Sequence, residues 1–316
     1  MAITLAEAKV GMADKVDQQV IDELRRNSII LDKLVFDDAV SPGTGGSTLT
    51  YGYVTLETAA TAGKRSLNSE YTAQEAKRAK NTVELAIMGG AFEIDRVIAN
   101  TSGAVDEINF QLTQKTKSTI AQFYNSMING VKSTDGFDGL KTLLKGKSTE
   151  IDGSTTNVSG AMDETNAEAL CELLDSAIAE MDGRPDFILA NHKTIVKLKA
   201  AARKAGYITR SESAFGTPAE GYDGIPFVDA GNYNNDGTET SIIPITEGKT
   251  DIYLIRTGLD GVHGVTVNGD KMLKTYLPDL NLPGAVKKGE VEFIVATVLK
   301  SSRAAARIKD LQISAA

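Results

Sequence analysis

One segment of the sequence has the residue types and spacing of a calcium-binding loop. "NYNNDGTETSII" places Asn232, Asn234, Asp236 and Gly237 at the first ligand positions and at the glycine of such a loop. The closing glutamate is missing, because Ile243 occupies the twelfth position. Asn, Asp and Gly favour tight turns through their backbone preferences alone. The segment therefore predicts a surface turn and no metal site.

Nucleophiles and metal ligands are scarce in the rest of the chain. His192 and His263 are far apart in sequence, and neither has a Cys or an acidic residue at metal-ligand spacing. Cys171 shares the apolar side of a predicted helix with Leu174 and Ile178, where a free thiol behaves as a small hydrophobic group. No phosphate-loop, dinucleotide or nucleophile-elbow motif occurs. We expect no catalytic residue, no cofactor and no metal.

An acidic, glycine-rich stretch at residues 126–144, "SMINGVKSTDGFDGLKTLL", raises the question of a ligand loop again. Asp135 and Asp138 flank Gly136, but no further carboxylates follow at regular spacing. Asp-Gly pairs are typical of turns. The local chemistry therefore favours a corner of the chain over a ligand loop.

Composition excludes several classes of protein. The chain has 316 residues, a length that favours about two domains, and carries a formal net charge of −8. It has no dense run of Lys and Arg, which disfavours direct DNA binding. A single cysteine rules out an intrachain disulfide framework and predicts folding in a reducing cytoplasm. No apolar run is long enough to span a bilayer, so no membrane partner is expected.

The N-terminal third predicts two segments that lack a core of their own. Residues 14–34 have apolar side chains at helical spacing, Val20 and Leu24 among them, and so form an amphipathic arm that ends at the Gly/Pro linker of residues 41–46. Residues 47–94 predict a long β-hairpin with a polar tip. Such a hairpin needs a second surface to stabilise it.

A long helix is predicted next, followed by an α/β section. Ser102 can cap the long helix and Gly130 ends it, which gives a rod of about 36 Å at about 1.5 Å per residue. In the α/β section one helix opens with Thr165 and Glu168 at capping-box spacing, and Asn191 caps another. Several buried strands separate these helices, and the C-terminal residues predict two strands around a turn.

This order of elements, with "NG…GFDGL", "PDFILANHKTIVKLKA" and "GIPFVDAGNY", resembles the major capsid protein of tailed bacteriophages. Encapsulin shells share its Hong Kong 97-type capsid fold. The resemblance implies an α+β fold with an N-terminal arm, an extended β-hairpin loop, a peripheral domain with a long spine helix, and an α/β axial domain. The implied boundaries are 1–46 for the arm, 47–94 for the extended loop, 95–140 and 262–316 for the peripheral domain, and 141–261 for the axial domain.

The resemblance also implies a function. It suggests a non-enzymatic protein that self-assembles, through hexamers and pentamers, into the icosahedral head of a tailed phage around double-stranded DNA. Assembly in the host cytoplasm, residence in the virion capsid, and scaffolding, portal and decoration partners would follow. An encapsulin-type compartment is the alternative within the fold. A small-molecule enzyme would need a pocket with convergent titratable residues, which the sequence does not supply.

Contacts between subunits are expected at the two segments without a core. In the hairpin these are Glu57, Lys64, Arg65 and Glu70, and in the arm they are Val20 and Leu24. Some relatives crosslink a lysine of the extended loop to an asparagine of a neighbour. Lys64 has the place for that role, but ordinary ion pairs of Lys64 and Arg65 are favoured over it.

Overall fold

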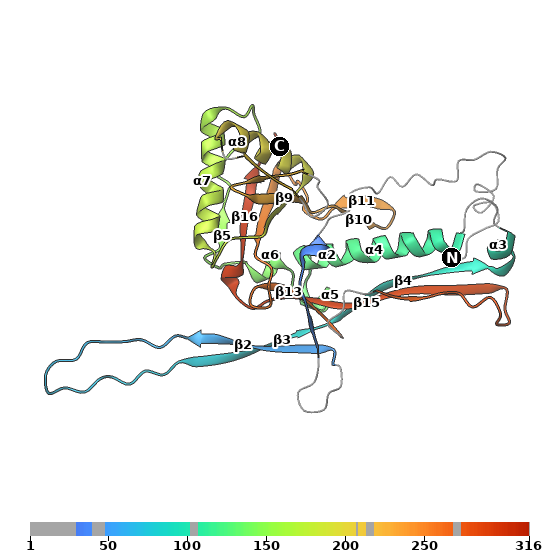
Figure 1. The fold of residues 1–316 in the computed structure, drawn as a ribbon, viewed down its shortest axis with the longest axis horizontal. Helices are drawn as coiled ribbons and strands as arrows, with labels where there is room; N and C mark the ends of the chain where they lie inside the picture. The colour runs from blue at the N-terminus through green and yellow to red at the C-terminus, as the bar shows by residue number, and fades with distance from the viewer. Residues whose placement is uncertain are drawn as a thin grey trace.

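A computed structural model describes residues 30–39, 48–101, 107–206, 208–212, 218–267 and 273–315. Val20 and Leu24 of the predicted arm, and the predicted cap Ser102, lie outside these residues. The described chain has three parts: a seven-stranded sheet with two helices, a long helix on a five-stranded sheet, and a hairpin that projects away from both (Figure 1). None of the helices in the described ranges is long and apolar enough to cross a membrane.

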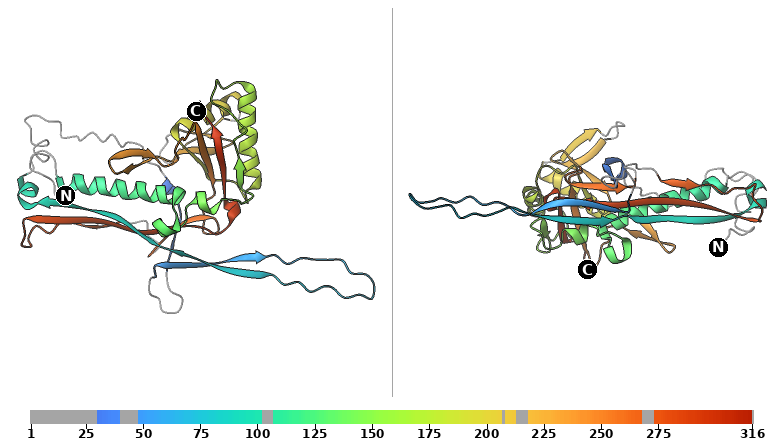
Figure 2. Two further views of the ribbon diagram at one scale, coloured as in Figure 1. Left: turned by 180° about the vertical axis from the view of Figure 1, so that it is seen from behind. Right: turned by 90° about the horizontal axis from the view of Figure 1, so that it is seen from below.

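The five-stranded sheet is built around one long strand, β15 (Val286–Leu299). Its neighbours are β4 (Ala86–Asp95), β13 (Val262–Thr266) and β14 (Lys274–Tyr276), and β1 (Phe36–Asp38) pairs in parallel with β13. Helix α4 (Glu107–Asn129) runs along one face of this sheet, beside β4 and β15 in both views (Figures 1 and 2). The short helices α2 (Ile30–Lys33) and α3 (Arg96–Thr101) lie at the start of the described chain and after β4.

Aromatic rings fill the space between α4 and this sheet. Phe123 of α4 meets Phe293 of β15 edge-on, with ring centroids 5.6 Å apart, and Phe36 of β1 lies 6.5 Å from each. The Phe36 ring sits over Gly264, where a Cβ atom would come within 2.4 Å of it. A glycine at this position of β13 therefore makes room for the aromatic core. The predicted long helix is confirmed over residues 107–129 and ends before Gly130, as its sequence indicated.

The predicted corner is confirmed at the end of α4. Two single turns, α5 (Lys132–Asp135) and α6 (Leu140–Leu143), follow, and Gly136 between them has a φ of 83°. The Gly139 amide donates to the Gly130 carbonyl at 2.9 Å. The Asp138 carboxylate accepts from the Lys132 amide at 2.9 Å, so it closes the turn. The chain passes through this corner from the long helix to the seven-stranded sheet.

The seven-stranded sheet has a different core on each face. Ile188 and Leu254 belong to a cluster with side chains of α7 (Glu164–Glu180) and α8 (His192–Lys204), whereas their neighbours Leu189 and Tyr253 pack with α4 and the corner. Side chains alternate between the faces of a strand, so α7 and α8 cover one face together. The strands, in spatial order, are β5 (Glu150–Asp152), β16 (Ala305–Gln312), β12 (Lys249–Ile255), β6 (Phe187–Ala190), β9 (Ile225–Asp229), β8 (Pro218–Tyr222) and β7 (Ile208–Glu212).

Strand pairing differs from the sequence prediction at two places. Both C-terminal strands exist, but β15 lies in the five-stranded sheet and β16 lies between β5 and β12, with the short helix η1 (Ser302–Ala304) between them. The last strand of segment 262–316 is therefore part of the sheet formed by residues 141–261. The second half of the predicted hairpin is also divided. Leu85 is buried and its amide donates to the Leu49 carbonyl. Pairing with the first strand of the hairpin ends at Leu85, and the following strand, β4, pairs with β15 instead.

Two local predictions can be compared directly with the structure. Asp163 caps α7 by accepting from the Asn166 amide, so the predicted capping box of Thr165 and Glu168 is wrong. An aspartate before the predicted start competes successfully because its side chain reaches the free amides of the first turn. The predicted cap Asn191 of α8 is confirmed, since its side chain accepts from the Lys193 amide at 3.0 Å.

The calcium-like segment is a β-hairpin of β10 (Asn232–Asn235) and β11 (Thr238–Ser241). Its turn residues Asp236 and Gly237 both have positive φ, at 49° and 84°, which is the geometry of a two-residue type I′ turn. Asn234 accepts from the Gly237 amide at 2.7 Å, and Asn232 is bonded to Ser241 and Glu239. The predicted turn is confirmed, because the side chains that resembled ligands are used within the hairpin.

Candidate assembly surface

The projecting hairpin is the most distinctive surface of the described chain. Strands β2 (Thr50–Thr58) and β3 (Lys77–Glu84) pair in antiparallel register from Thr50 opposite Glu84 to Thr58 opposite Lys77. The connection, residues 59–76, is exposed throughout and has no regular structure. It extends well past the rest of the molecule (Figures 1 and 2).

The root of the hairpin is anchored to the body by two tyrosines of β2. The Tyr51 hydroxyl donates to Asp37 Oδ2 at 2.6 Å, and the Tyr53 hydroxyl donates to the Leu299 carbonyl at 3.3 Å. Lys300 Nζ lies 5.3 Å from the centroid of the Tyr51 ring and 3.9 Å from Asp37. These contacts come from β1 and from the end of β15, so the root is attached to the five-stranded sheet.

The groups around this root have shifted pKa values. Burial raises the pKa of Tyr51, and its hydrogen bond to Asp37 raises it further. Burial alone would raise the pKa of Asp37, but hydrogen bonds from Tyr51 and the Asp38 amide, with the charge of Lys300, bring it below its ordinary value. His263 is fully buried, with its ring 5.8 Å from that of Tyr51, and burial lowers its pKa. A neutral imidazole therefore supports the root.

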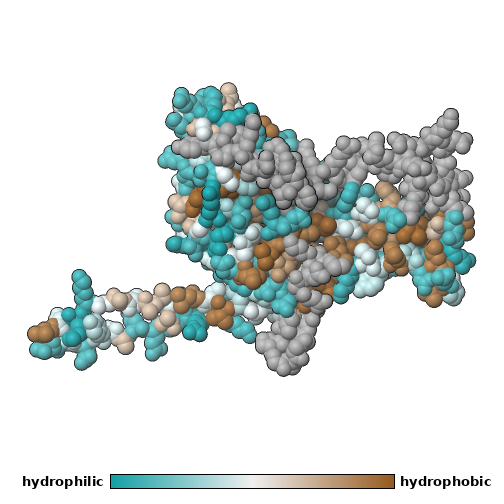
Figure 3. All heavy atoms as spheres, viewed as in Figure 1, coloured by the Kyte–Doolittle hydropathy of each residue, from teal (hydrophilic) through white to brown (hydrophobic). Residues whose placement is uncertain are grey.

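Beyond the root, one face of the hairpin is open. Val54 and Leu56 are each 63% exposed on β2, and they lie opposite Lys80 and Arg78 of β3. In the connection, Leu67 is 90% exposed. Figure 3 shows apolar side chains among hydrophilic ones along the projecting hairpin. A two-stranded ribbon with exposed apolar residues has no core to stabilise it, which is typical of a surface that another molecule covers.

The predicted contact residues of the hairpin all lie in this open region. Glu57, Lys64, Arg65 and Glu70 are exposed. Arg65 is bonded within its own connection: Nη1 donates to the Ser69 carbonyl at 3.2 Å and the guanidinium lies 5.5 Å from a tyrosine ring centroid. Neither Lys64 nor Arg65 forms an ion pair with a described residue. Their role between subunits stays a prediction.

Sequence reasoning missed the open face itself. Val54, Leu56, Arg78 and Lys80 share a face only because β2 and β3 pair in this particular register. The alternation in "TYGYVTLE" separates Tyr51 and Tyr53 from Val54 and Leu56, and it was the one available signal. This alternation does not indicate which of the two pairs of side chains faces the body of the subunit.

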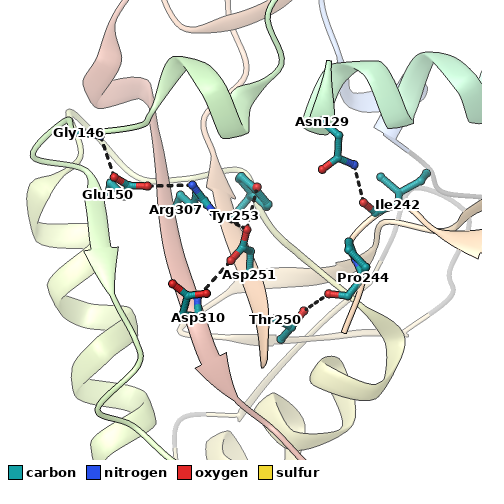
Figure 4. Close-up of polar contacts among 10 residues, drawn as sticks. All are labelled: Asn129, Gly146, Glu150, Ile242, Pro244, Thr250, Asp251, Tyr253, Arg307 and Asp310. Carbon is teal, nitrogen blue, oxygen red and sulfur yellow. Dashed lines mark hydrogen bonds and ion pairs between the residues drawn. The ribbon is translucent and has the colours of Figure 1, made fainter. Parts of the chain in front are cut away.

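A second polar cluster lies beneath the corner, where a cavity of about 370 Å³ is lined by Lys141, Tyr253 and Arg307, among others. The Arg307 guanidinium donates to Glu150 Oε1 and Asp251 Oδ2, each at 2.8 Å (Figure 4). These three side chains are 10%, 10% and 16% exposed. The single guanidinium bridges both carboxylates, so this is an internal ion network that ties β5, β12 and β16 together.

Other chemistry-bearing residues occupy structural positions. Cys171 is buried in the α7 cluster, as predicted, and burial raises the pKa of its thiol. His192 is the first residue of α8 and His263 supports the hairpin root. No group of three or more His, Cys, Asp or Glu residues within the described ranges is placed to hold a metal ion.

Solved structures of other proteins share this architecture. No family model matches the sequence, and no curated protein matches it. Solved structures match over the whole chain. The SrpI encapsulin of Synechococcus elongatus PCC 7942 aligns with a TM-score of 0.67 at 16% identity, covering 100% of this chain and 99% of its own.

Two phage structures match over a similar length. The capsid of Myoviridae phage XM1 aligns with a TM-score of 0.61 at 11% identity, and a structure from Mycobacterium phage Bobi with 0.63 at 12%. Each alignment covers 98% of this chain and 99% of the other. The chain therefore has the Hong Kong 97-type α+β fold that phage capsids and encapsulin shells share, as its sequence predicted. At these identities the likeness establishes the fold.

Proposed function

We propose that this protein is the major structural subunit of the icosahedral head of a tailed phage, assembled in the bacterial cytoplasm around double-stranded DNA. The observation that carries the proposal is the projecting hairpin, with exposed Val54 and Leu56 on a capsid fold. A neighbouring subunit that receives this face removes apolar surface from water, at about 25 cal/mol per Å². No catalytic role is assigned, because the titratable residues beneath the corner are paired with one another.

The domain organisation proposed for this subunit keeps the predicted parts but moves two strands, β4 and β16. The arm (1–46) and residues 47–85 of the predicted extended loop contact neighbours, whereas β4, the remainder of that loop, belongs to the peripheral domain. The peripheral domain contains α4 and the five-stranded sheet, and the axial domain contains the seven-stranded sheet with β16. Portal, scaffolding and decoration proteins are the expected further partners.

Replacement of the hairpin connection tests the proposal. Residues 59–76 are exchanged for Asn-Gly, which links Thr58 to Lys77 through the two-residue turn that an antiparallel pair accepts. We expect a folded subunit with an unchanged circular dichroism spectrum that no longer forms shells by electron microscopy. A variant that still closes into normal particles contradicts the proposal, and so does a variant that unfolds.

A milder pair of variants separates the apolar face from the connection. Val54→Thr with Leu56→Thr keeps strand-forming residues but removes apolar surface, so assembly should weaken. Leu259→Thr is the control, because Leu259 is 48% exposed in the turn between β12 and β13 and is not part of the open face of the hairpin. Equal assembly of both variants would argue against the open face.

An encapsulin-type compartment is the second candidate, supported by the TM-score of 0.67 with the SrpI encapsulin. Purified particles distinguish the two. A phage head protects double-stranded DNA from added nuclease, whereas a compartment of this type contains a cargo protein and little nucleic acid.

A further inference from the structure

The helices α7 and α8 separate charge of opposite sign. Helix α7 contains five acidic residues and no basic one, and α8 contains five basic residues and no acidic one. The acidic residues are Glu164, Glu168, Glu172, Asp175 and Glu180, and the basic residues are Lys193, Lys197, Lys199, Arg203 and Lys204. Both helices cover the same face of the seven-stranded sheet and contact each other (Figure 1).

The acidic residues of α7 form a row on its exposed side. Glu164, Glu168 and Glu172 follow one another at intervals of four residues, and all three are exposed. Like charges at this spacing repel and destabilise a helix. None of the three forms an ion pair with a described residue. The row therefore weakens the isolated subunit unless a cationic surface covers it.

The basic residues of α8 are only partly used within the chain. Lys199 pairs with Glu220 at 3.3 Å, and Lys197 Nζ donates to the carbonyl of Gly160 at 2.8 Å. Lys193 and Lys204 are exposed and form no ion pair with a described residue. Val196, 63% exposed, lies between them on the helix. This is a cationic face with an apolar centre.

The two helices do not neutralise each other within one subunit. Their contact is apolar, through residues such as Leu170, Leu174 and Leu198, and no ion pair joins them among the described residues. The exposed carboxylates of α7 and the exposed Lys193 and Lys204 of α8 lie outside this apolar contact. Each remains available to another molecule.

We propose that the acidic row of α7 in one copy of this chain binds the basic face of α8 in a second copy. Charge complementarity identifies the occupant, because both halves of the contact are present on the same chain. A bound polyanion would account for the basic face but would leave the acidic row uncovered. When two different surfaces of one protein bind each other, the contact repeats head to tail and can close into a ring. The inference rests on the proposed function, to which it adds a specific contact between subunits.

Charge reversal on each helix separately, and then on both helices of one chain, tests this contact. The acid-reversed variant carries Glu168→Lys and Glu172→Lys, and the base-reversed variant carries Lys193→Glu and Lys204→Glu. Each alone should keep its circular dichroism spectrum but need at least about tenfold more protein for light scattering to detect assembly, because several weak charge pairs are lost at every contact. A variant with all four reversals should assemble like the wild type, because a basic α7 row then meets an acidic α8 face at every contact, whatever the number of subunits in the ring.

Salt and a matched control separate this contact from a general effect of charge. The control carries Lys145→Glu and Lys147→Glu at two exposed lysines of a loop. It changes the net charge by the same amount and sign as the base-reversed variant, and should assemble normally. For the wild type, 1 M salt should raise the concentration needed, since the screening length falls from about 10 Å at 0.1 M to about 3 Å.

The remaining outcomes are distinguishable. If both folded variants assemble alone like the wild type, or if the folded variant with all four reversals fails to assemble, the contact between α7 and α8 is refuted while the proposed function stands. If only the base-reversed variant is impaired, and it also loses binding to a DNA oligonucleotide, the basic face is a polyanion surface and the inference is wrong. A wild-type protein that stays monomeric under all conditions refutes the proposed function instead.

Discussion

Removal of the Arg307 side chain should be among the most damaging single changes in the seven-stranded sheet. Arg307 makes two short contacts at 2.8 Å, one to Glu150 and one to Asp251, and its Nε donates again to Asp251 at 3.1 Å. Arg307→Met keeps the unbranched aliphatic part of the side chain but removes the charge. Two nearly buried carboxylates then remain without their cation.

The size of the loss follows from this geometry. Removing one partner of a buried ion pair costs about 3–5 kcal/mol. Three donors stay in place (Figure 4). The Gly146 amide still donates to Glu150 at 2.8 Å, and Asp251 still accepts from the Asp310 amide at 3.2 Å and from the Tyr253 hydroxyl at 3.4 Å. We therefore expect a loss near the lower end, about 3 kcal/mol. Domains of this kind have about 5–15 kcal/mol in total, so the variant should still fold.

Urea unfolding followed by circular dichroism measures this loss. The Asn-Gly hairpin variant is the suitable background, because it is expected to stay unassembled. The triple variant Glu150→Gln, Asp251→Asn, Arg307→Met removes all three charges and should recover at least half of the lost stability, because no buried charge is left unpaired. A loss below about 1 kcal/mol in Arg307→Met, or no recovery in the triple variant, would refute the argument.

Three further changes test other parts of the structure. Gly139→Ala should cost about 2 kcal/mol or more in urea unfolding, because its Cβ would lie 2.6 Å from the Gly130 backbone nitrogen, whereas Gly160→Ala, with open space around it, should be neutral. Burial lowers the pKa of His263 from its ordinary value of 6.5, so the free energy of unfolding should be fully retained above that pH and fall as the pH drops below it. His263→Gln should flatten this pH dependence. An unchanged slope would show that His263 is not responsible. Cys171→Ala should cost at most about 2 kcal/mol and leave assembly intact, and the wild-type thiol should react with a thiol reagent only after unfolding; loss of assembly at normal stability would reveal a contact role.

Local sequence determined those elements whose signals lie within a few residues. The apolar stripe and Gly130 set the span of α4, Asn191 capped α8, and Asp-Gly predicted the turn at residues 236–237. Capping and turn formation depend on side chains and backbone of the same segment, so the sequence contains the whole cause. The capping box at Thr165 failed because the helix begins earlier, where Asp163 accepts from the Asn166 amide, so Thr165 already lies inside the first turn.

The hairpin was predicted from its polar, coreless connection, and order of elements indicated the capsid fold. The tertiary structure decided which residues pair. Pairing with β2 ends at Leu85, and the next strand, β4, pairs with β15. The last strand, β16, follows β15 in sequence but pairs with β12. Strand partners are chosen by hydrogen bonds and packing between segments far apart in the chain, for which no local pattern exists.

The same reason explains the surfaces that only the folded chain revealed. Arg307 meets Glu150 across 157 positions of sequence, and Val54 and Leu56 form the open face of the hairpin because Tyr51 and Tyr53 are held by the body. The charged residues of α7 and α8 can be counted in the sequence. Only the packing of both helices on one sheet face shows that the helices lie side by side and leave these charges uncovered. Sequence fixes which chemical groups a segment carries, and long-range packing decides which of them are left for a partner.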